Sequence, residues 1–307
     1  MFAQVDRILR PQGFMFYGWY IVGAGAGLQM LSGLLWMQSY GAYVVLLQDE
    51  FGWSSAWVAG AFALTRIESG ILGPLQGWLV DRFGPRAILR IGIVIFGFGF
   101  IMFSQVNDLL TFYLTFGLIA LGASLGGFAT VMVAIVNWFS RHRSKAVALS
   151  LMGYSVGGMS VPIVILCLES FGWRTTAMLS GLLVLIVGLP LAQLVRHKPE
   201  TTGDAPDGMV TVDEDGQPTV GGLSAGVGFT AKQAMRTSAF WLISIGHACS
   251  LLTVSTVMVH LVPHLTGGLN YPLSQAGLVV ALMTGSQMIG QLSGGYLGDR
   301  VSKRLIC

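Results

Sequence analysis

Long apolar runs with few charges constrain this chain most strongly. The segments from Tyr17 to Leu47, from Trp57 to Val80 and from Leu109 to Phe139 contain hardly any charge. Each exceeds the ~20 residues that a helix needs to cross a ~30 Å hydrocarbon layer. Only 10% of the residues are charged, whereas soluble domains have about 25%. The sequence therefore predicts an all-α, multi-spanning membrane protein, because helices satisfy their own backbone hydrogen bonds in lipid.

Eight membrane helices are expected from these runs and from the shorter apolar segments between charged turns. They cover residues 17–47, 57–80, 88–106, 109–139, 146–168, 174–195, 238–266 and 275–298. Glycines four residues apart, such as Gly153 and Gly157, predict close helix contacts, since small residues let membrane helices approach one another.

The basic residues predict the orientation. If the N-terminus is cytoplasmic, all of the 17 lysines and arginines except Arg66 and Arg174 fall in cytoplasmic segments. Cytoplasmic loops carry such an excess of positive charge. We expect an integral protein of the plasma membrane, in a bacterium the inner membrane, with a cytoplasmic N-terminus.

One long connection divides the chain. Residues 196–237 contain the acidic, Gly- and Pro-rich stretch DAPDGMVTVDEDGQP, which cannot bury enough apolar surface to fold alone. We interpret it as a cytoplasmic linker between a six-helix bundle, residues 1–195, and a partial second bundle, residues 238–307.

A charged turn occurs twice. GWLVDRFGPR at 77–86 returns as GYLGDRVSKR at 295–304, without a gap. The shared positions are Gly77, Leu79, Asp81, Arg82 and Arg86 in the first copy, and Gly295, Leu297, Asp299, Arg300 and Arg304 in the second. The expected helices 2 and 8 therefore correspond, and two bundles of like orientation are implied, as in transporters built from parallel repeats.

These residues resemble those of the major facilitator superfamily. Its signature G-x-x-x-D-R-x-G-x-R is matched by Gly77, Asp81, Arg82, Gly84 and Arg86. The segments EFGWS (50–54), GYSVGGMSVP (153–162) and FGWR (171–174) further resemble its monocarboxylate and oxalate–formate branch. The resemblance implies twelve helices, so a chain with eight is expected to be truncated after helix 8.

The resemblance also implies a gating role for the repeated turn. In the family the turn holds the cytoplasmic side closed in the outward-facing state. Asp81 would then contact a helix 11 that this chain does not contain, and Asp299 would lie near Arg143 and Lys145. The alternative is that these charges only set the topology.

Charged groups inside a predicted helix are candidates for the solute site. Arg66 lies ~22 Å from the helix end at Asp81, where an unpaired arginine costs at least ~2.5–3.5 kcal/mol. Thr284 and Ser286 take the places of Arg66 and Glu68 in the repeat, so the scaffold does not require charge there. We expect Arg66 and Glu68 to bind substrate or to couple transport; the alternative is an ion pair with another helix.

Three glutamines are further candidates. Gln287 and Gln291 share a helix face near the expected membrane midplane. In the resembled monocarboxylate transporters these two positions hold an aspartate and an arginine, and a lysine falls near Gln38. Because all three are amides here, we expect them to line the cavity by hydrogen bonding, or alternatively to join helices.

Histidines offer a route for protons. His247 and His260 lie in the expected seventh helix, and histidine is a side chain that proteins commonly use to carry protons. They are candidates for proton coupling, against ordinary packing. His260 and His264 are four residues apart, but no acidic or cysteine partner indicates a metal site.

The prediction that results is a secondary transporter that moves a small organic anion, a monocarboxylate or dicarboxylate, by alternating access. A coupled proton or counter-anion would accompany the solute. The alternative is a non-transporting membrane sensor or an inactive truncated remnant. Neither a nucleophile–base set nor a phosphate-binding loop indicates an enzyme, and we expect no cofactor, metal or nucleic acid.

Overall fold

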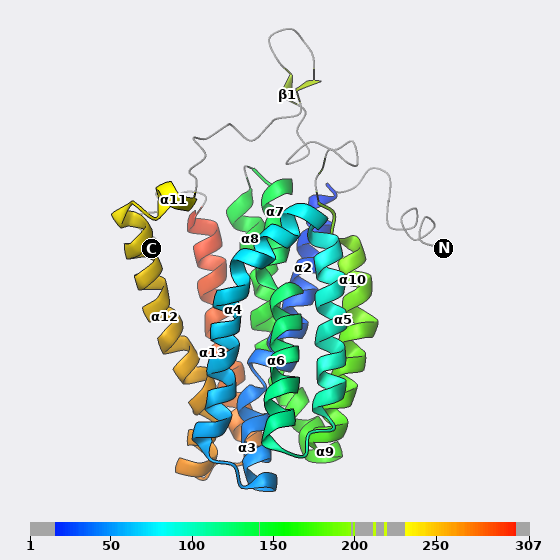
Figure 1. The fold of residues 1–307 in the computed structure, drawn as a ribbon, viewed down its shortest axis with the longest axis vertical. Coiled ribbons are helices and arrows are strands. Elements are labelled where there is room, and N and C mark those ends of the chain that lie inside the picture. The colour runs from blue at the N-terminus through cyan, green and yellow to red at the C-terminus, as the bar shows by residue number, and fades with distance from the viewer. Residues whose placement is uncertain are drawn as a thin grey trace.

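The chain runs back and forth as long, nearly parallel helices (Figure 1). The computed structural model describes residues 16–140, 142–197, 199, 211–212, 218–219 and 231–298. Within these described residues, five helical stretches are long and apolar enough to cross a membrane by length and composition: Gly18–Phe51, Pro85–Phe103, Leu109–Trp138, Arg143–Leu194 and Ser238–Gly268. Helix α4 (Ser55–Phe83) and helix α13 (Leu273–Gly298) run beside them in the same bundle.

Several of the expected crossings are interrupted helices, including the first, the fourth and the sixth. The first is α2 (Gly18–Ser32), the π-helical turn η1 (Gly33–Met37) and α3 (Tyr40–Phe51). The fourth is α6 (Leu109–Leu125) and α7 (Phe128–Trp138). The sixth ends as η2 (Val184–Gly188) and α10 (Leu189–Leu194). The sequence predicted one helix for each of the ranges 17–47, 109–139 and 174–195, whereas the structure divides each of these crossings into more than one helical element.

The remaining elements follow the expected order. They are α5 (Pro85–Phe103), α8 (Arg143–Met159) and α9 (Val161–Leu183), which is non-helical at Gly172. Strands β1 (Thr211–Val212) and β2 (Pro218–Thr219) pair antiparallel. The short α11 (Ala231–Ala234), α12 (Ser238–Pro263), η5 (His264–Gly268) and α13 complete the description. The predicted linker lies mostly outside the described residues, and the division at 195 and 238 remains a prediction.

Small residues bring α2 and α8 together. A Cβ added at Gly153 would overlap the carbonyl oxygen of Ala26, and one at Gly157 would lie 2.5 Å from the oxygen of Met30. Only glycine permits this approach, which confirms the helix contacts that were predicted from the spacing.

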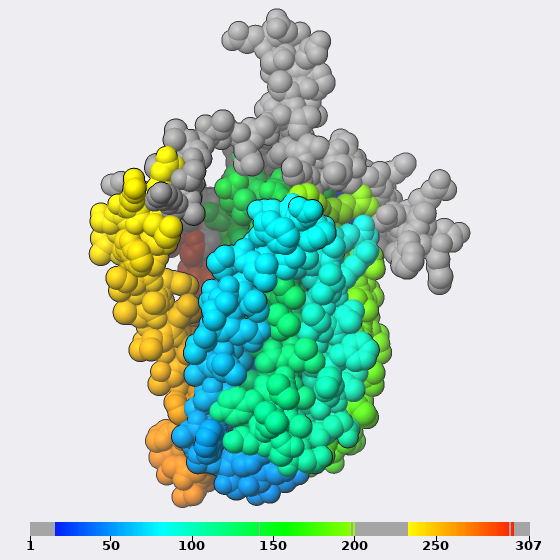
Figure 2. Space-filling view, viewed as in Figure 1, coloured from blue at the N-terminus to red at the C-terminus, as the bar shows by residue number. Residues whose placement is uncertain are grey.

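The last two helices contact the six-helix bundle unequally. Helix α13 packs along α8 and α9, with Thr284 against Gly158. The C-terminal end of helix α12 contacts α3, where Val262 lies against Gly41. Most side chains of α12 are exposed. The space-filling view shows a recess between α12 and α4, with α13 behind it (Figure 2).

Candidate functional site

A cavity of about 450 Å³, open on one side, is lined by residues between Gln29 and Tyr154. The elements around it are α2, η1, α4, the α6–α7 junction and α8. Its walls combine one charged, several polar and several apolar side chains: Gln29, Ser32, Trp36, Met37, Thr65, Arg66, Ser69, Gln76, Ser124, Phe128 and Tyr154 among others. Cavities of this size and mixed lining are typical of small-molecule sites.

Among the described residues that line this cavity, Arg66 is the only charged one. Its Cζ atom lies 4.9 Å from the centre of the Phe62 ring, and a guanidinium nitrogen lies 3.9 Å from Sδ of Met37. Across the described part of the chain, the one ion pair joins Arg174 and Glu50. The side chain of Arg66 therefore presents a positive charge that no described carboxylate neutralises, and this arrangement favours an anion.

The break between α6 and α7 opens into the same cavity. Gly127, Phe128 and Ala129 form part of the lining, and Gly127 is the N-cap of α7. The first backbone N–H groups of a helix have no intrahelical partner, and they lie at the positive end of the helix dipole. The start of α7 thus adds to the positive potential around Arg66.

Gln76 bridges this break from α4. Its buried amide nitrogen donates to the carbonyl oxygen of Ser124 at 2.7 Å and to Oγ1 of Thr130 at 3.0 Å. Its amide oxygen accepts from Oγ of Ser124 at 3.3 Å, and Thr130 in turn donates to the carbonyl of Leu125 at 2.8 Å. One side chain therefore fixes the end of α6 to the start of α7.

The sequence analysis missed both Gln76 and the helix break. The signal was present as the pair Gly126–Gly127 within a long apolar run, with Ser124 and Thr130 on either side. An arginine in an apolar run is marked by its charge, whereas nothing in the sequence around Gln76 marks its amide as part of a cavity.

The structure does not bring Glu68 to Arg66. Glu68 is half-buried and lies outside the lining of the cavity. On α4 it follows the exposed Leu64 by four residues and precedes the exposed Ile71 and Leu75 by three and seven, so it shares their face. Its proposed role in substrate binding or coupling remains a prediction.

The three glutamines also lie away from the cavity lining. Gln38 is 3% exposed, and neither atom of its amide has a hydrogen-bond partner in the described structure. Oε1 of Gln291 accepts from Oγ of Ser155 at 2.9 Å, which joins α13 to α8 as the alternative interpretation expected. Gln287 is exposed on α13.

The histidines lie on one exposed helix. His247 and His260 belong to α12, and His264 begins η5; all three are exposed and none lines the cavity. Their proton-coupling role remains a prediction.

The first charged turn has the geometry that its glycine predicts. Gly84 has φ of +80°, a conformation that favours glycine, and it allows α5 to begin at Pro85. Asp81 is exposed at this turn, Cζ of Arg82 lies 5.6 Å from the Trp78 ring, and Arg86 donates to Oε1 of Gln193 at 3.1 Å. A Cβ added at Gly77 would meet no atom within 4 Å.

The second copy of the turn is only partly visible. Gly295 belongs to α13, whereas Asp299, Arg300 and Arg304 lie outside the described residues. The predicted approach of Asp299 to Arg143 therefore has no structural test. Arg143 itself donates to the carbonyl oxygen of Phe139 at 3.2 Å.

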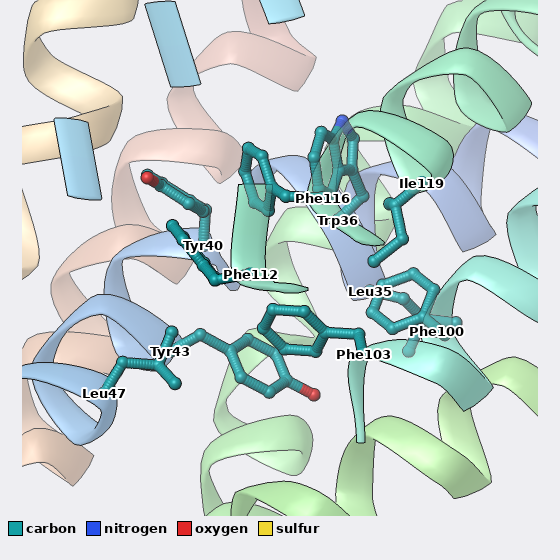
Figure 3. Close-up of a pocket in the computed structure, with 10 residues that line it drawn as sticks. All are labelled: Leu35, Trp36, Tyr40, Tyr43, Leu47, Phe100, Phe103, Phe112, Phe116 and Ile119. Carbon is teal, nitrogen blue, oxygen red and sulfur yellow. The ribbon is translucent and has the colours of Figure 1, made fainter. Parts of the chain in front are cut away.

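A second void is part of the hydrophobic core. Its volume is only about 10 Å³, and aromatic rings such as those of Trp36, Tyr40 and Phe116 surround it (Figure 3). A void of this volume holds one water at most. The hydroxyl of Tyr40 donates to the carbonyl of Val58 at 2.6 Å, so the ring is fixed from both ends.

The fold also occurs in solved transporter structures. An inward-facing, occupied bacterial homologue of the human lysosomal transporter Spinster superposes with a TM-score of 0.67 at 17% identity, over 95% of this chain and 63% of the other. At this identity the likeness shows the fold alone, which is the predicted all-helical membrane bundle.

Three curated relatives share sequence with this chain. Human monocarboxylate transporter 11 is 32% identical over 171 residues, or 55% of this chain and 36% of the relative. The membrane sensor protein UhpC of Salmonella typhimurium is 27% identical over 83% of this chain and 61% of its own length. The oxalate:formate antiporter of Oxalobacter formigenes is 26% identical over 73% and 50%. The chain thus spans between about a third and two thirds of the length of these relatives.

The family assignment depends on a longer match. The sequence profile of the Major Facilitator Superfamily covers residues 20–307, which confirms the resemblance that the charged turn indicated. The match indicates a transporter family rather than an enzyme, and together with the apolar helices it indicates an integral, multi-pass membrane protein. The chain belongs to the Major Facilitator Superfamily.

Proposed function

We propose that the protein carries a small organic anion across the membrane by alternating access, with the carboxylate of the solute bound to Arg66. The observation that carries the proposal is a guanidinium in a cavity of about 450 Å³ whose other lining residues are uncharged. A planar guanidinium matches a carboxylate with two parallel hydrogen bonds. The relatives named for monocarboxylate and for oxalate and formate support this class of solute.

The cavity wall suggests how the solute is oriented. Trp36, Met37 and Phe128 provide apolar surface, while Gln29, Ser69 and Tyr154 provide hydrogen-bonding groups. A carboxylate at Arg66 and beside the start of α7 would leave the remainder of a short-chain acid against the apolar wall. We assign the protein to the plasma membrane with a cytoplasmic N-terminus, because the basic residues are distributed as the positive-inside pattern requires.

The test is uptake by proteoliposomes that contain the full-length protein. A panel of radiolabelled oxalate, formate, lactate and succinate is offered against a counter-anion gradient or a pH gradient. We expect saturable uptake of at least one acid, a loss of at least ten-fold in Arg66→Gln, and partial recovery in Arg66→Lys. Arg236→Gln serves as a control because Arg236 is exposed and distant in sequence from the site.

A sensor is the second candidate, and the similarity to UhpC favours it. A sensor would bind the same anion without carrying it. Equilibrium binding that depends on Arg66, together with no saturable uptake, would support the sensor and contradict transport.

A further inference from the structure

A methionine sulfur lies beside the charge of the cavity. Sδ of Met37, the last residue of η1, is 3.9 Å from a guanidinium nitrogen of Arg66. Both side chains line the cavity, and Met37 is the only methionine among the described lining residues. A thioether sulfur is a weak hydrogen-bond acceptor, so this contact leaves the N–H group of Arg66 available to a stronger acceptor.

The side chain of Met37 is accessible from the cavity. It is half-buried, and the cavity of about 450 Å³ that it lines is open on one side. One water occupies about 30 Å³ of liquid, so the cavity has room for water and for an oxidant as small as hydrogen peroxide. Methionine exposed to such an oxidant is converted to its sulfoxide, a polar side chain.

The backbone around Met37 is fixed on both sides. At Gly33, where η1 begins, an added Cβ would lie 2.6 Å from the carbonyl oxygen of Tyr154 on α8. Just after η1, Oγ of the buried Ser39 donates to the carbonyl oxygen of Leu34 at 2.5 Å. A change in the chemistry of the Met37 side chain is therefore retained at the cavity wall.

Oxidation converts Met37 from a weak to a strong acceptor. A lone pair of Sδ takes one oxygen atom from hydrogen peroxide: an S–O bond forms, the O–O bond breaks, and the other oxygen leaves with both hydrogens as water. The sulfur loses two electrons, and the peroxide gains them.

The new oxygen has room to reach Arg66. The separation of 3.9 Å between Sδ and the guanidinium nitrogen exceeds the ~2.9 Å of an N–H···O hydrogen bond. Rotation about the last bonds of the flexible methionine side chain brings a sulfur-bound oxygen within that distance. The sulfoxide then competes with the carboxylate of the solute for the same N–H donors.

We propose that Met37 is a reversible oxidation site that lowers the affinity of the cavity for anions. The inference rests on the proposed function, because it acts through the binding of a carboxylate to Arg66. Methionine sulfoxide reductases restore the thioether, so the modification is a switch: the protein binds less acid while peroxide is abundant and recovers afterwards.

Oxalate binding before and after treatment with hydrogen peroxide tests this proposal. The sample is the full-length protein in detergent with its native cysteines replaced by serine, so that peroxide acts on methionines. Peptide mass spectrometry follows the added oxygen at each methionine. We expect the affinity for oxalate to fall at least five-fold in proportion to the sulfoxide at Met37, and to recover after treatment with the two methionine sulfoxide reductases and dithiothreitol.

Three variants assign the effect to one contact. Met37→Leu cannot be oxidised at this position and should keep its own starting affinity through the treatment. Met235→Leu removes an exposed methionine that lies outside the cavity lining, and it should respond like wild type. In Arg66→Gln, Met37 should still be oxidised, but the residual oxalate binding should change less than two-fold because no guanidinium remains for the sulfoxide to occupy.

The opposite results decide against the proposal. Unchanged affinity at full conversion of Met37 would overturn it, as would a Met37 that stays reduced while Met235 is fully converted, or an equal loss of affinity in Met37→Leu. Should Met37→Leu aggregate, the time course of wild type decides, since affinity must fall in step with oxidation of Met37 and not of Met235. If untreated wild type and Arg66→Gln bind oxalate equally, the proposed function fails and this inference with it, whereas Arg66-dependent binding that ignores oxidation of Met37 overturns this inference alone.

Discussion

The residues around the cavity have different roles. Arg66 supplies charge. Its Cζ atom lies 4.9 Å from the centre of the Phe62 ring, and a guanidinium nitrogen lies 3.9 Å from Sδ of Met37. Gln76 supplies no charge but fixes the break between α6 and α7 through hydrogen bonds to Ser124 and Thr130. Anion binding that depends both on the charge of Arg66 and on the ordered start of α7 requires Arg66 and Gln76 together.

Gln76→Leu should weaken anion binding without removing the charge of the site. The substitution leaves the Ser124 carbonyl and the Thr130 hydroxyl with fewer partners, and an unsatisfied buried group costs about 1–3 kcal/mol. We expect a lower thermal midpoint and a several-fold higher dissociation constant for the organic acid that the protein is proposed to carry. The measurements are tryptophan-monitored unfolding and equilibrium binding in detergent.

Gln105→Leu is the matched control, because Gln105 is exposed in the loop after α5 and its amide bonds only to Ser104 in the described structure. An equal effect of both substitutions would contradict a positioning role for Gln76.

The sequence indicated Arg66, which lines the cavity, but not the neutral Gln76 that lines it as well. An arginine in an apolar run is conspicuous because its burial is costly. A glutamine or a glycine pair in the same run has no such cost and has other common uses, such as helix contacts. The amides Gln287 and Gln291 illustrate this, since the second joins two helices through Ser155 and neither lines the cavity.

At the scale of elements, the helix order was predictable and the interruptions were not. Apolar length and charged turns indicated approximately where crossings begin and end: the expected helices 57–80 and 88–106 correspond to Ser55–Phe83 and Pro85–Phe103. The π-helical turns at Gly33–Met37 and Val184–Gly188 depend on tertiary contacts. At Gly33, for example, a Cβ would lie 2.6 Å from the carbonyl oxygen of Tyr154 on the neighbouring α8.

Gly127→Ala should disrupt the α6–α7 break. A Cβ at this position would overlap the carbonyl oxygen of Ala123, whereas a Cβ at Gly117 on the same crossing would meet no atom within 4 Å. We expect Gly127→Ala to lower the thermal midpoint and to weaken anion binding. Gly117→Ala should preserve binding and leave stability equal or higher, since alanine favours a helix interior by about 0.5–1 kcal/mol.

Binding of the acid and thermal unfolding of both alanine variants provide the readout. If Gly127→Ala binds and unfolds like Gly117→Ala, the backbone at the break has no special part in the site.

At the scale of the whole molecule, one end of the bundle gathers the segments that the charge pattern assigns to the cytoplasm. The α4–α5 turn, the end of α10 and the start of α12 lie at the same end in Figure 1. At the opposite end, Arg174 pairs with Glu50 at 3.1 Å and donates to Oδ1 of Asn107 at 3.2 Å. The one basic loop residue assigned to the outside thus has a local partner.

Site-directed labelling should confirm this orientation. Phe83 is 56% exposed at the α4–α5 turn, and Asn107 is exposed at the opposite end. In a full-length variant free of native cysteines, a membrane-impermeant maleimide added to intact cells should label Asn107→Cys but not Phe83→Cys. After the membrane is opened, both should react.

Labelling of Phe83→Cys in intact cells would show that the orientation is the reverse of the predicted one.

The central claim is that the charge of Arg66 binds the carboxylate of the solute, and equilibrium binding of a charged ligand and its uncharged analogue tests it most directly. Oxalate and oxamide have similar size and shape, but only oxalate is an anion. For the full-length protein we predict that Arg66→Gln weakens oxalate binding at least ten-fold, about 1.4 kcal/mol, and leaves the weaker binding of oxamide nearly unchanged. Equal affinity of wild type and Arg66→Gln for oxalate, or an equal loss for both ligands, would contradict the account.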